Sequence, residues 1–333
     1  MSGGLKEDEA LWDKIKDVCE FDLFALEDAG DSDSLDIASV NESLADKLHV
    51  LKRRVFFELY TRRNPQEQQQ LYVDDIDALK KSNFDFSKPT KIVTHGWINS
   101  AKDDAVSLVR DAYLQHGDYN VIGINWGNIA FRPYSWASRR VLIVGKYCAS
   151  FIDFLQSQGL NLSTLTVVGH SLGAHVAGLS ARFAQGQVEH VVALDPALPN
   201  FILAGPGERV ARGDANYVEV IHTDAGFYGY VDPIGDIDFY PNGGSQQPGC
   251  VSNICSHTRA YKYFAESINN QAGFVGYKCE SYSKFRDDIC DSSPKAYMGS
   301  MKPDYEAKGK YYLNSNAKSP YALGDVALKQ SSA

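Results

Sequence analysis

The sequence VVGHSLGAHVAG, residues 167–178, decides the fold of this chain. Two β-branched residues lead into it, Gly169 and Gly173 stand two residues to either side of Ser171, and a helix-compatible run continues to Ala184. This order predicts a strand, a tight turn and a helix. Ser171 would lie in the turn, either as a nucleophile or as a serine that caps the helix.

A serine hydroxyl is a useful nucleophile only when a base removes its proton and hydrogen-bond donors stabilise the resulting oxyanion. The G-x-S-x-G spacing meets the geometric part of this need, because the glycines let the backbone pass closely and leave the serine exposed at the start of a helix. The N–H of Leu172 then becomes one oxyanion donor. The stretch IVTHGWINS offers a second donor in the N–H of Trp97, with His95 ordering the loop.

An acid and a base for this serine follow later in the chain. Asp195 comes directly after the apolar segment VVAL, where a carboxylate would emerge at the same sheet edge as Ser171. Asp224, after VEVIHT, is the rival carboxylate. Of the two histidines after Asp195, His222 ends an apolar strand and suits packing, whereas His257 lies in a predicted loop. We expect His257 to be the base, with Asp195 fixing its tautomer.

Apolar strand candidates alternate with segments that are long enough for helices. This alternation predicts an α/β fold with a mostly parallel sheet that is covered on both faces. The candidates are RVFFELY (54–60), KIVTH (91–95), NVIGINW (120–126), LTVVGH (165–170), VVALD (191–195) and YVEVIH (217–222).

The composition is that of a globular protein, with 333 residues, 44% of them hydrophobic and 23% charged. The negative charge is concentrated at the start: residues 1–47 contain four lysines and fourteen acidic residues, a net charge of −10, which leaves +1 on residues 48–333. We expect an acidic, partly mobile N-terminal arm, and such an arm argues against nucleic-acid binding. The most apolar stretch, 141–155, contains Lys146 and Asp153 and predicts a half-buried helix rather than a membrane span.

Six cysteines allow 15 pairings. Cys250 and Cys255 are close in sequence, as are Cys279 and Cys290, and each pair could close a small loop; Cys19 and Cys148 are either free or paired with each other. Asn41 and Asn161 begin N-x-S sequons, which fit a glycosylating, oxidising route. The opening residues MSGGLKEDEALW lack the apolar region of a signal peptide. We nevertheless expect an extracellular protein.

Seven short motifs, THGW, GHSLGAHVAG, LDPA, VEVIHTD, DFYPNGG, QPGC and CSH, follow one another in the order found in the pancreatic (animal) lipase family, which the chain resembles from about residue 50 to 325. The resemblance implies an α/β-hydrolase fold and carries over Ser171, Asp195 and His257 as the catalytic triad. It also implies Trp97 and Leu172 as oxyanion donors. The implied disulfide bonds are Cys250–Cys255 and Cys279–Cys290.

The chain departs from the triacylglycerol lipases of this family at the segment that covers their active site. Those lipases carry a long helical lid between two cysteines, whereas only residues 251–254 lie between Cys250 and Cys255. About four residues form one helical turn, so we expect an open site. The neighbouring loop, 225–237, also looks short. The short segment and the short loop are similar to those of the A1 phospholipases of insects and their venoms, which cleave the sn-1 ester.

The resemblance also bears on partners and organisation. The larger members add a C-terminal β-sandwich domain, which this chain is too short to contain, so no colipase partner is expected. A stretch that binds calcium in some relatives keeps Asp214 but has Ala211 in place of an acid; we expect neither a metal nor another cofactor. The predicted domains are the acidic arm, 1–47, an α/β-hydrolase domain, 48–325, and a C-terminal tail, 326–333.

Three functions remain open from the sequence. The first is an sn-1 phospholipase that touches a membrane or lipid interface transiently. The second is a neutral triacylglycerol or galactolipid lipase. The third differs in kind: a non-catalytic yolk, storage or lipid-binding relative, from which the nucleophile is expected to be lost. The presence of Ser171 and the short lid favour the first.

Overall fold

A computed structural model describes residues 50–290 and 293–325. The predicted arm, Cys19, the sequon at Asn41 and the predicted tail from residue 326 lie outside the described residues. The sequon at Asn161 is described: its side chain is exposed in a turn before a central strand.

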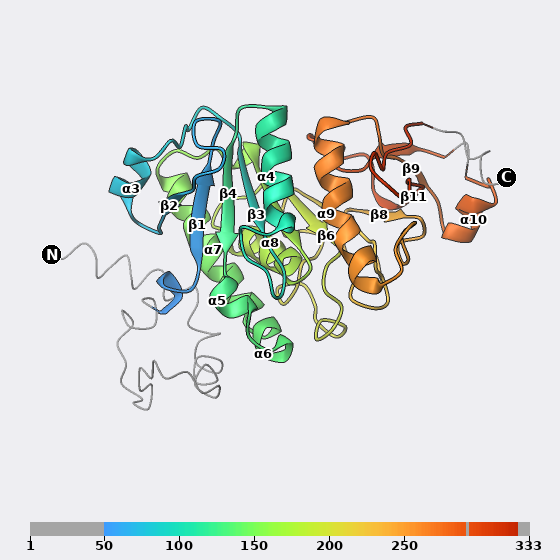
Figure 1. Cartoon of the computed structure of the whole chain (residues 1–333), viewed down its shortest axis with the longest axis horizontal. Helices are drawn as coiled ribbons and strands as arrows, with labels where there is room; N and C mark the ends of the chain where they lie inside the picture. The colour runs from blue at the N-terminus through green and yellow to red at the C-terminus, as the bar shows by residue number, and fades with distance from the viewer. Residues whose placement is uncertain (1–49, 291–292, 326–333) are drawn as a thin grey trace.

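Every described strand belongs to one eleven-stranded sheet, in the order β10-β9-β11-β8-β7-β6-β5-β3-β4-β1-β2 (Figure 1). Seven neighbouring strands, from β11 to β4, run parallel, and antiparallel strands flank them at both ends. The strands are β1 (Phe56–Tyr60), β2 (Gln69–Leu71), β3 (Thr90–Thr94), β4 (Asn120–Asn125), β5 (Leu165–His170), β6 (His190–Leu194), β7 (Tyr217–Ile221), β8 (Ile237–Pro241), β9 (Val275–Lys278), β10 (Lys295–Tyr297) and β11 (Gly309–Leu313).

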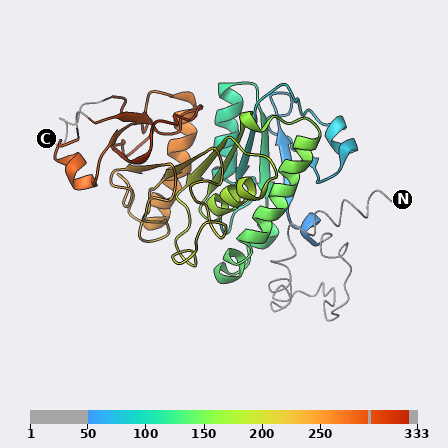
Figure 2. The ribbon, with the colours of Figure 1, turned by 180° about the vertical axis from the view of Figure 1, so that it is seen from behind.

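Helices cover both faces of the sheet, as predicted. Figures 1 and 2 show α4 and α9 on one face and α7 and α8 on the other, with each pair packed together. The arrangement is the α/β-hydrolase fold. The helices are α3 (Ile76–Lys81), α4 (Asp104–His116), α5 (Gly127–Ala130), α6 (Tyr134–Ser138), α7 (Val141–Ser157), α8 (Leu172–Phe183), α9 (Asn253–Asn269) and α10 (Tyr282–Arg286), with a 3-10 turn, η2, at Leu162–Thr164.

Successive side chains in a strand point to opposite faces of the sheet, so the apolar side chains are divided between two cores. In β5, Val167 belongs to the core beneath α7 and α8, and its neighbour Val168 belongs to the core beneath α4 and α9. Because both sides are covered, the central strands are buried throughout and contain near-continuous apolar runs. A third, smaller cluster packs α10 against the strands at the β9 end.

The helix α7 is more buried than its sequence indicates. The stretch 141–155 predicts a half-buried helix, but thirteen of the seventeen residues of α7 are buried. Lys146 is among them, with its amine 4.9 Å from the ring centre of Phe183. A lysine can bury its methylene stem while its charge meets an aromatic face, so a single charge in the sequence did not mark an exposed side.

Two disulfide bonds are formed, Cys250–Cys255 and Cys279–Cys290. Cys148 is buried in α7 and forms no disulfide bond with another described residue. No helix within residues 50–290 and 293–325 combines the length and apolar character that spanning a bilayer would require.

Candidate active site

The predicted site residues meet at the carboxyl ends of four adjacent strands, β3, β5, β6 and β7. Ser171 follows β5 directly, and Asp195 follows β6 directly. Trp97 lies in the loop after β3, and Asp224 lies three residues beyond β7. Since these strands are parallel, residues from distant parts of the chain emerge at one sheet edge.

Ser171 occupies a sharp turn between β5 and α8. Its backbone has φ 59° and ψ −124°, a conformation that a residue with a side chain rarely adopts. The turn is tight because β5 and α8 touch here: a Cβ on Gly169 would lie 2.0 Å from the carbonyl oxygen of Gly173, and one on Gly173 would lie 2.3 Å from that of His95. The Ser171 hydroxyl makes no capping hydrogen bond. The turn therefore holds Ser171 in place without using its side chain, which argues against the capping interpretation.

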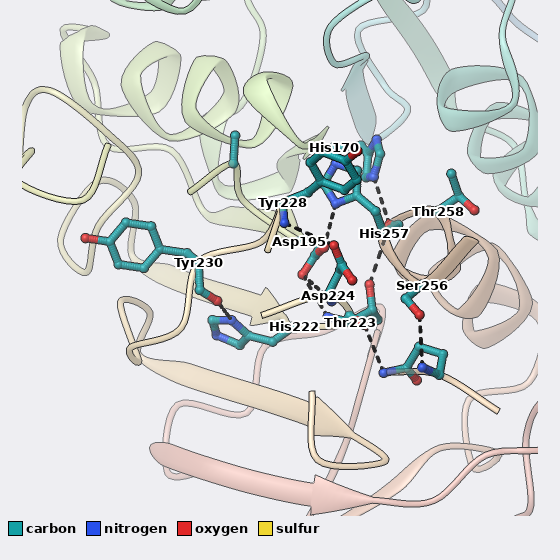
Figure 3. A network of polar contacts seen from close by, with 12 residues as sticks. His170, Asp195, His222, Thr223, Asp224, Tyr228, Tyr230, Ser256, His257 and Thr258 are labelled. Atoms are coloured by element: carbon teal, nitrogen blue, oxygen red, sulfur yellow. Dashed lines mark hydrogen bonds and ion pairs between the residues drawn. The ribbon is translucent and has the colours of Figure 1, made fainter. Parts of the chain in front are cut away.

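Asp195 and His257 form a hydrogen bond in which Nδ1 of the imidazole lies 2.6 Å from Oδ2 of the carboxylate (Figure 3). Asp195 is fully buried, and its Oδ1 accepts N–H groups of Thr223 and Asp224 at 2.8 and 3.1 Å. The Asp195 carboxylate can accept all three hydrogen bonds when Nδ1 of His257 carries a proton. In that neutral tautomer Nε2 of His257 has the lone pair that a general base needs.

The predicted setting of His257 was wrong in one respect. The sequence predicts a loop after Cys255, but His257 lies in the second turn of α9, which begins at Asn253. The N-cap is Ser252, whose side chain accepts the N–H of Cys255 at 3.3 Å. The short Cys250–Cys255 segment leads into a capped helix, so helical packing orients the imidazole, which is 13% exposed.

The Ser171 hydroxyl forms no hydrogen bond with a described residue, so the structure does not join it directly to His257. The ring of His170, the residue before Ser171, lies with its centre 4.5 Å from that of His257. Hydrogen bonds between a nucleophile and its base are often long in enzymes without bound substrate and tighten when it binds.

Asp224, the rival carboxylate, is buried beside this pair but bonds elsewhere. Its Oδ2 accepts the N–H of Tyr228 at 3.0 Å (Figure 3). Burial raises the pKa of Asp224 to about 6, and the charge of Asp195 adds to the rise. Ligand atoms of Asp195, Asp224 and His257 lie within 4.8 Å of one another, which is also the composition of a metal site. Since both oxygens of Asp195 already accept N–H groups, the cluster is better suited to holding an imidazole.

The loop after β3 lies against Ser171. A Cβ on Gly96 would come within 2.7 Å of the Ser171 Cβ, so this close approach needs a glycine. His95 is fully buried; its Nδ1 lies 2.9 Å from the Gly96 carbonyl oxygen, and its Nε2 accepts the N–H of Trp126. Burial lowers the pKa of His95 to about 4, so it stays neutral and orders the loop as expected.

The two expected oxyanion donors stand on either side of this contact. Trp97 follows Gly96, with its indole N–H donating to the Arg132 carbonyl at 2.7 Å, and Leu172 follows Ser171 as the first residue of α8. Neither backbone N–H donates a hydrogen bond to another described residue. Two free N–H groups beside one serine are what an oxyanion site requires.

Two residues that support the site were not singled out from the sequence. Thr223 supplies one of the N–H groups on Asp195, and its own carbonyl accepts a hydrogen bond from Gln247 at 3.1 Å. The backbone N–H of Gln247 donates to the Ser256 hydroxyl, next to His257 (Figure 3). Gln247 lies in the motif QPGC, and this motif was the only feature of the sequence that pointed to Gln247. His175 bonds to the Ala197 carbonyl, and His222 bonds through Nδ1 to the Tyr230 carbonyl and through Nε2 to the buried carboxylate of Asp238.

The segment between Cys250 and Cys255 leaves apolar side chains in solvent. Val251 is fully exposed and Ile254 is 63% exposed. Phe227, in the β7–β8 loop, is 58% exposed and stacks edge-on against Tyr228, whose ring centre lies 5.6 Å from that of His257. The rim of the site thus presents apolar groups.

Asp214, left from the calcium-binding stretch of some relatives, is bound by protein donors. Its Oδ1 accepts a hydrogen bond from Arg182 at 3.1 Å and its Oδ2 accepts the N–H of Ala211 at 2.7 Å. Burial raises the pKa of Asp214 to about 6. The guanidinium of Arg182 supplies the positive charge at this position.

Comparison with known proteins gives a match over most of the chain. A family model described as Lipase matches residues 28–321, starting inside the stretch expected to be the acidic arm. The pancreatic triacylglycerol lipase of Sus scrofa is 34% identical over 300 residues, which cover 80% of this chain and 66% of that protein. Pancreatic lipase-related protein 2 of Rattus norvegicus is 34% identical over 281 residues, 76% of this chain and 60% of that protein. The chain thus spans about two thirds of these relatives, or less.

Solved structures share part of the architecture. An alpha/beta hydrolase from a deep-sea metagenome library aligns with 52% of this chain and 66% of its own, at 17% identity and a TM-score of 0.33. A phospholipase/carboxylesterase from Dyadobacter fermentans aligns with 54% of this chain and 79% of its own, at 15% identity and a TM-score of 0.32.

Proposed function

Because the chain belongs to the lipase family, we propose that it hydrolyses carboxylic ester bonds of lipids through a Ser171 acyl-enzyme. The observation that carries the proposal is the 2.6 Å hydrogen bond between Asp195 and His257, formed at the sheet edge where the Ser171 turn lies. Buried His222 also bonds a carboxylate that accepts backbone N–H groups, Asp238, but both of its ring nitrogens are bonded. Among the described residues His257 bonds only through Nδ1, so its Nε2 can act as the base while the Asp195 carboxylate stabilises the imidazolium that forms.

In the proposed reaction, Nε2 of His257 takes the hydroxyl proton as Ser171 attacks the ester carbonyl. The N–H groups of Trp97 and Leu172 stabilise the oxyanion. His257 then protonates the leaving alcohol, and the acyl group stays on Ser171. Water activated by His257 releases the fatty acid and restores the serine. These steps need no cofactor.

For the substrate we propose a phospholipid cleaved at the sn-1 ester. The support is the four-residue segment between Cys250 and Cys255, which runs into α9 and leaves Val251 fully exposed. So short a segment cannot cover an acyl chain, and it leaves room for a polar head group. The second candidate is a triacylglycerol, which is favoured by the names of the similar pancreatic lipases.

The proposed partner is the lipid surface itself. Exposed Phe227, Val251 and Ile254 at the rim would touch it transiently, and we expect no colipase. We also propose an extracellular location, because the two disulfide bonds persist in an oxidising compartment.

The test is an assay of the purified protein with a phospholipid, a galactolipid and a triacylglycerol side by side, followed by positional analysis of the released fatty acid. Ser171→Ala, with an unchanged melting temperature, should lower kcat by about 10⁶-fold, as loss of the nucleophile does in another serine hydrolase. Hydrolysis by Ser171→Ala at the wild-type rate would contradict the mechanism. Release from the triacylglycerol alone would leave the mechanism intact and replace the proposed substrate.

A further inference from the structure

His170 lies between the proposed nucleophile and the proposed base. It is the last residue of β5, directly before Ser171, and its side chain is only 3% exposed. Its ring centre lies 4.5 Å from that of His257 and 5.0 Å from that of Tyr261, which meets it edge-on one helical turn further along α9. The side chain therefore joins the strand that carries the nucleophile to the helix that carries the base.

Among the described residues, the side chain of His170 forms one hydrogen bond, and it is directed at the main chain of the base. Nε2 lies 3.0 Å from the carbonyl oxygen of His257 (Figure 3). A carbonyl only accepts, so Nε2 carries a proton. Nδ1 is buried and has no hydrogen-bond partner among the described residues. Burial, together with the neighbouring His257, keeps the pKa of His170 well below its ordinary value. His170 is thus a neutral donor.

We propose that His170 is a positioning residue for His257: its Nε2–H holds the His257 carbonyl and its ring packs against the His257 imidazole, so that the base faces Ser171. The inference rests on the proposed function. A buried nitrogen without a partner is costly, and an apolar side chain would avoid that cost. An apolar residue could not supply the Nε2–H on the other side of the ring, which donates to the His257 carbonyl.

Charge explains why a neutral donor suits this position. The base becomes an imidazolium in the transition state, and a positive charge within a few ångströms would oppose that change. Lysine or arginine could donate to the carbonyl but would bring such a charge. A neutral histidine donates without it.

The same chemistry recurs twice around the site. His95 donates to the Gly96 carbonyl beside the expected oxyanion donors, and Nε2 of His175 lies 2.8 Å from the Ala197 carbonyl, two residues after Asp195. Burial lowers the pKa of His95 to about 4 and that of His175 to about 3. A buried neutral imidazole thus fixes a carbonyl in the segments that carry Trp97, Asp195 and His257.

The test compares His170→Gln with His170→Met. Glutamine places an N–H near the position of Nε2, whereas methionine has nearly the same length and flexibility but no donor. The matched control is His190→Met, because His190 is equally buried and its Nε2 makes no hydrogen bond to a described residue, although it lies 3.6 Å from the Glu219 carboxylate. His190 is the first residue of β6, at the opposite sheet edge. Initial rates on a soluble short-chain ester are measured at least 20 °C below each melting temperature.

We expect His170→Met to lower kcat by about 10–100-fold, the effect of a small misplacement of a catalytic group, with KM unchanged. His170→Gln should recover most of this loss, and His190→Met should keep the wild-type kcat. A wild-type kcat in His170→Met, or equal losses in both His170 variants, would overturn the proposal. If His170→Met fails to fold, a kcat of His170→Gln near wild type supports it and a large loss overturns it. Ser171→Ala in the same assay separates the two proposals: if it stays active, the proposed function fails.

Discussion

Two carboxylates lie within reach of His257, and their hydrogen bonds distinguish them. Asp195 receives Nδ1 of His257, while Asp224 receives the N–H of Tyr228. Asp195→Asn should therefore lower kcat by about 10⁴-fold, as the equivalent change does in another serine hydrolase. Asp224→Asn keeps an oxygen for Tyr228 and should cost less than about 10-fold. Steady-state kinetics on a soluble ester would measure both, and a larger loss in Asp224→Asn would reverse the assignment.

Lys91 is a buried amine that forms no ion pair with a carboxylate within residues 50–290 and 293–325. It is 5% exposed, donates to the Thr166 hydroxyl at 2.8 Å, and lies 5.6 and 5.5 Å from the ring centres of Tyr113 and Tyr119. Burial lowers the pKa of Lys91 from 10.5 to about 8. A pKa difference of this size corresponds to roughly 3 kcal/mol.

The sign of its effect on stability follows from proton binding. Between pH 8 and 10.5 the unfolded chain binds more protons at this lysine than the folded chain does, so stability rises with pH across that window. Below pH 8 the amine is charged in the folded chain, and the full free-energy cost of burying that charge lowers stability. Lys91→Met should therefore raise the free energy of unfolding at pH 7 by about 1–3 kcal/mol, and the gain should shrink toward pH 10. Urea unfolding at several pH values measures this.

Lys88→Met is the control for Lys91, because Lys88 is partly exposed and pairs with the exposed Asp118 at the surface. It should change stability little at any pH. A Lys91→Met variant that is less stable than wild type at pH 7, with no dependence on pH, would show that the buried charge carries no such cost.

Among the elements, the Cys250–Cys255 segment has the clearest consequence for activity. Only four residues lie between the two cysteines, so we expect this segment not to close over the proposed site. Activity on a short-chain ester should rise smoothly as its concentration passes the solubility limit. Rates measured across that limit, with Ser171→Ala as the blank, check this. An abrupt rise at the limit would reveal a cover.

Periodicity predicted the elements that position the site, but not all of the sheet. Each of the six predicted strand segments overlaps a strand of the parallel block or β1, because buried parallel strands have continuous apolar runs. The strands β2 and β8–β11 were not predicted. Several are short or rich in tyrosine and charged residues, as in KAY and GKYYL. The strand β11 pairs with β8, which lies far away in sequence, and local patterns do not specify such a pairing.

The sequence could predict which residues form the proposed site, but not which elements carry them or which backbone groups hold them. Ordered motifs pointed to Ser171, Asp195 and His257, and parallel strands explain why the first two meet at one edge. The sequence did not predict that His257 lies in a helix, because CSH resembles a loop after a disulfide. It also could not show which backbone groups hold Asp195, since Thr223 and Gln247 have no chemistry of their own that marks them.

On the scale of the whole molecule, charge is separated along the chain. Residues 1–47 carry −10 and residues 48–333 carry +1. At about 0.01 M salt, charges act over about 30 Å, against about 3 Å at 1 M. A chain of residues 48–333 should therefore bind anionic vesicles more tightly than the full chain at low salt, and equally at high salt. Vesicle sedimentation measures this.

Zwitterionic vesicles and a soluble ester are the controls for the shortened chain, and neither should distinguish it from the full chain. Its melting temperature must match, because the family match begins at residue 28. Equal binding to anionic vesicles at low salt would mean that the negative charge of residues 1–47 does not act at the lipid surface.

At Ser171 the backbone angles favour glycine, whereas the proposed reaction needs the serine hydroxyl, so stability and activity favour different residues at this position. Glycine adopts φ 59° and ψ −124° readily, whereas a residue with a side chain pays about 1–3 kcal/mol for such a conformation. Ser171→Gly should therefore melt a few degrees higher than both wild type and Ser171→Ala, which differential scanning calorimetry can measure. Directed evolution that rewards heat resistance alone would accept this inactive protein as an improvement, so any such selection must score turnover in every round.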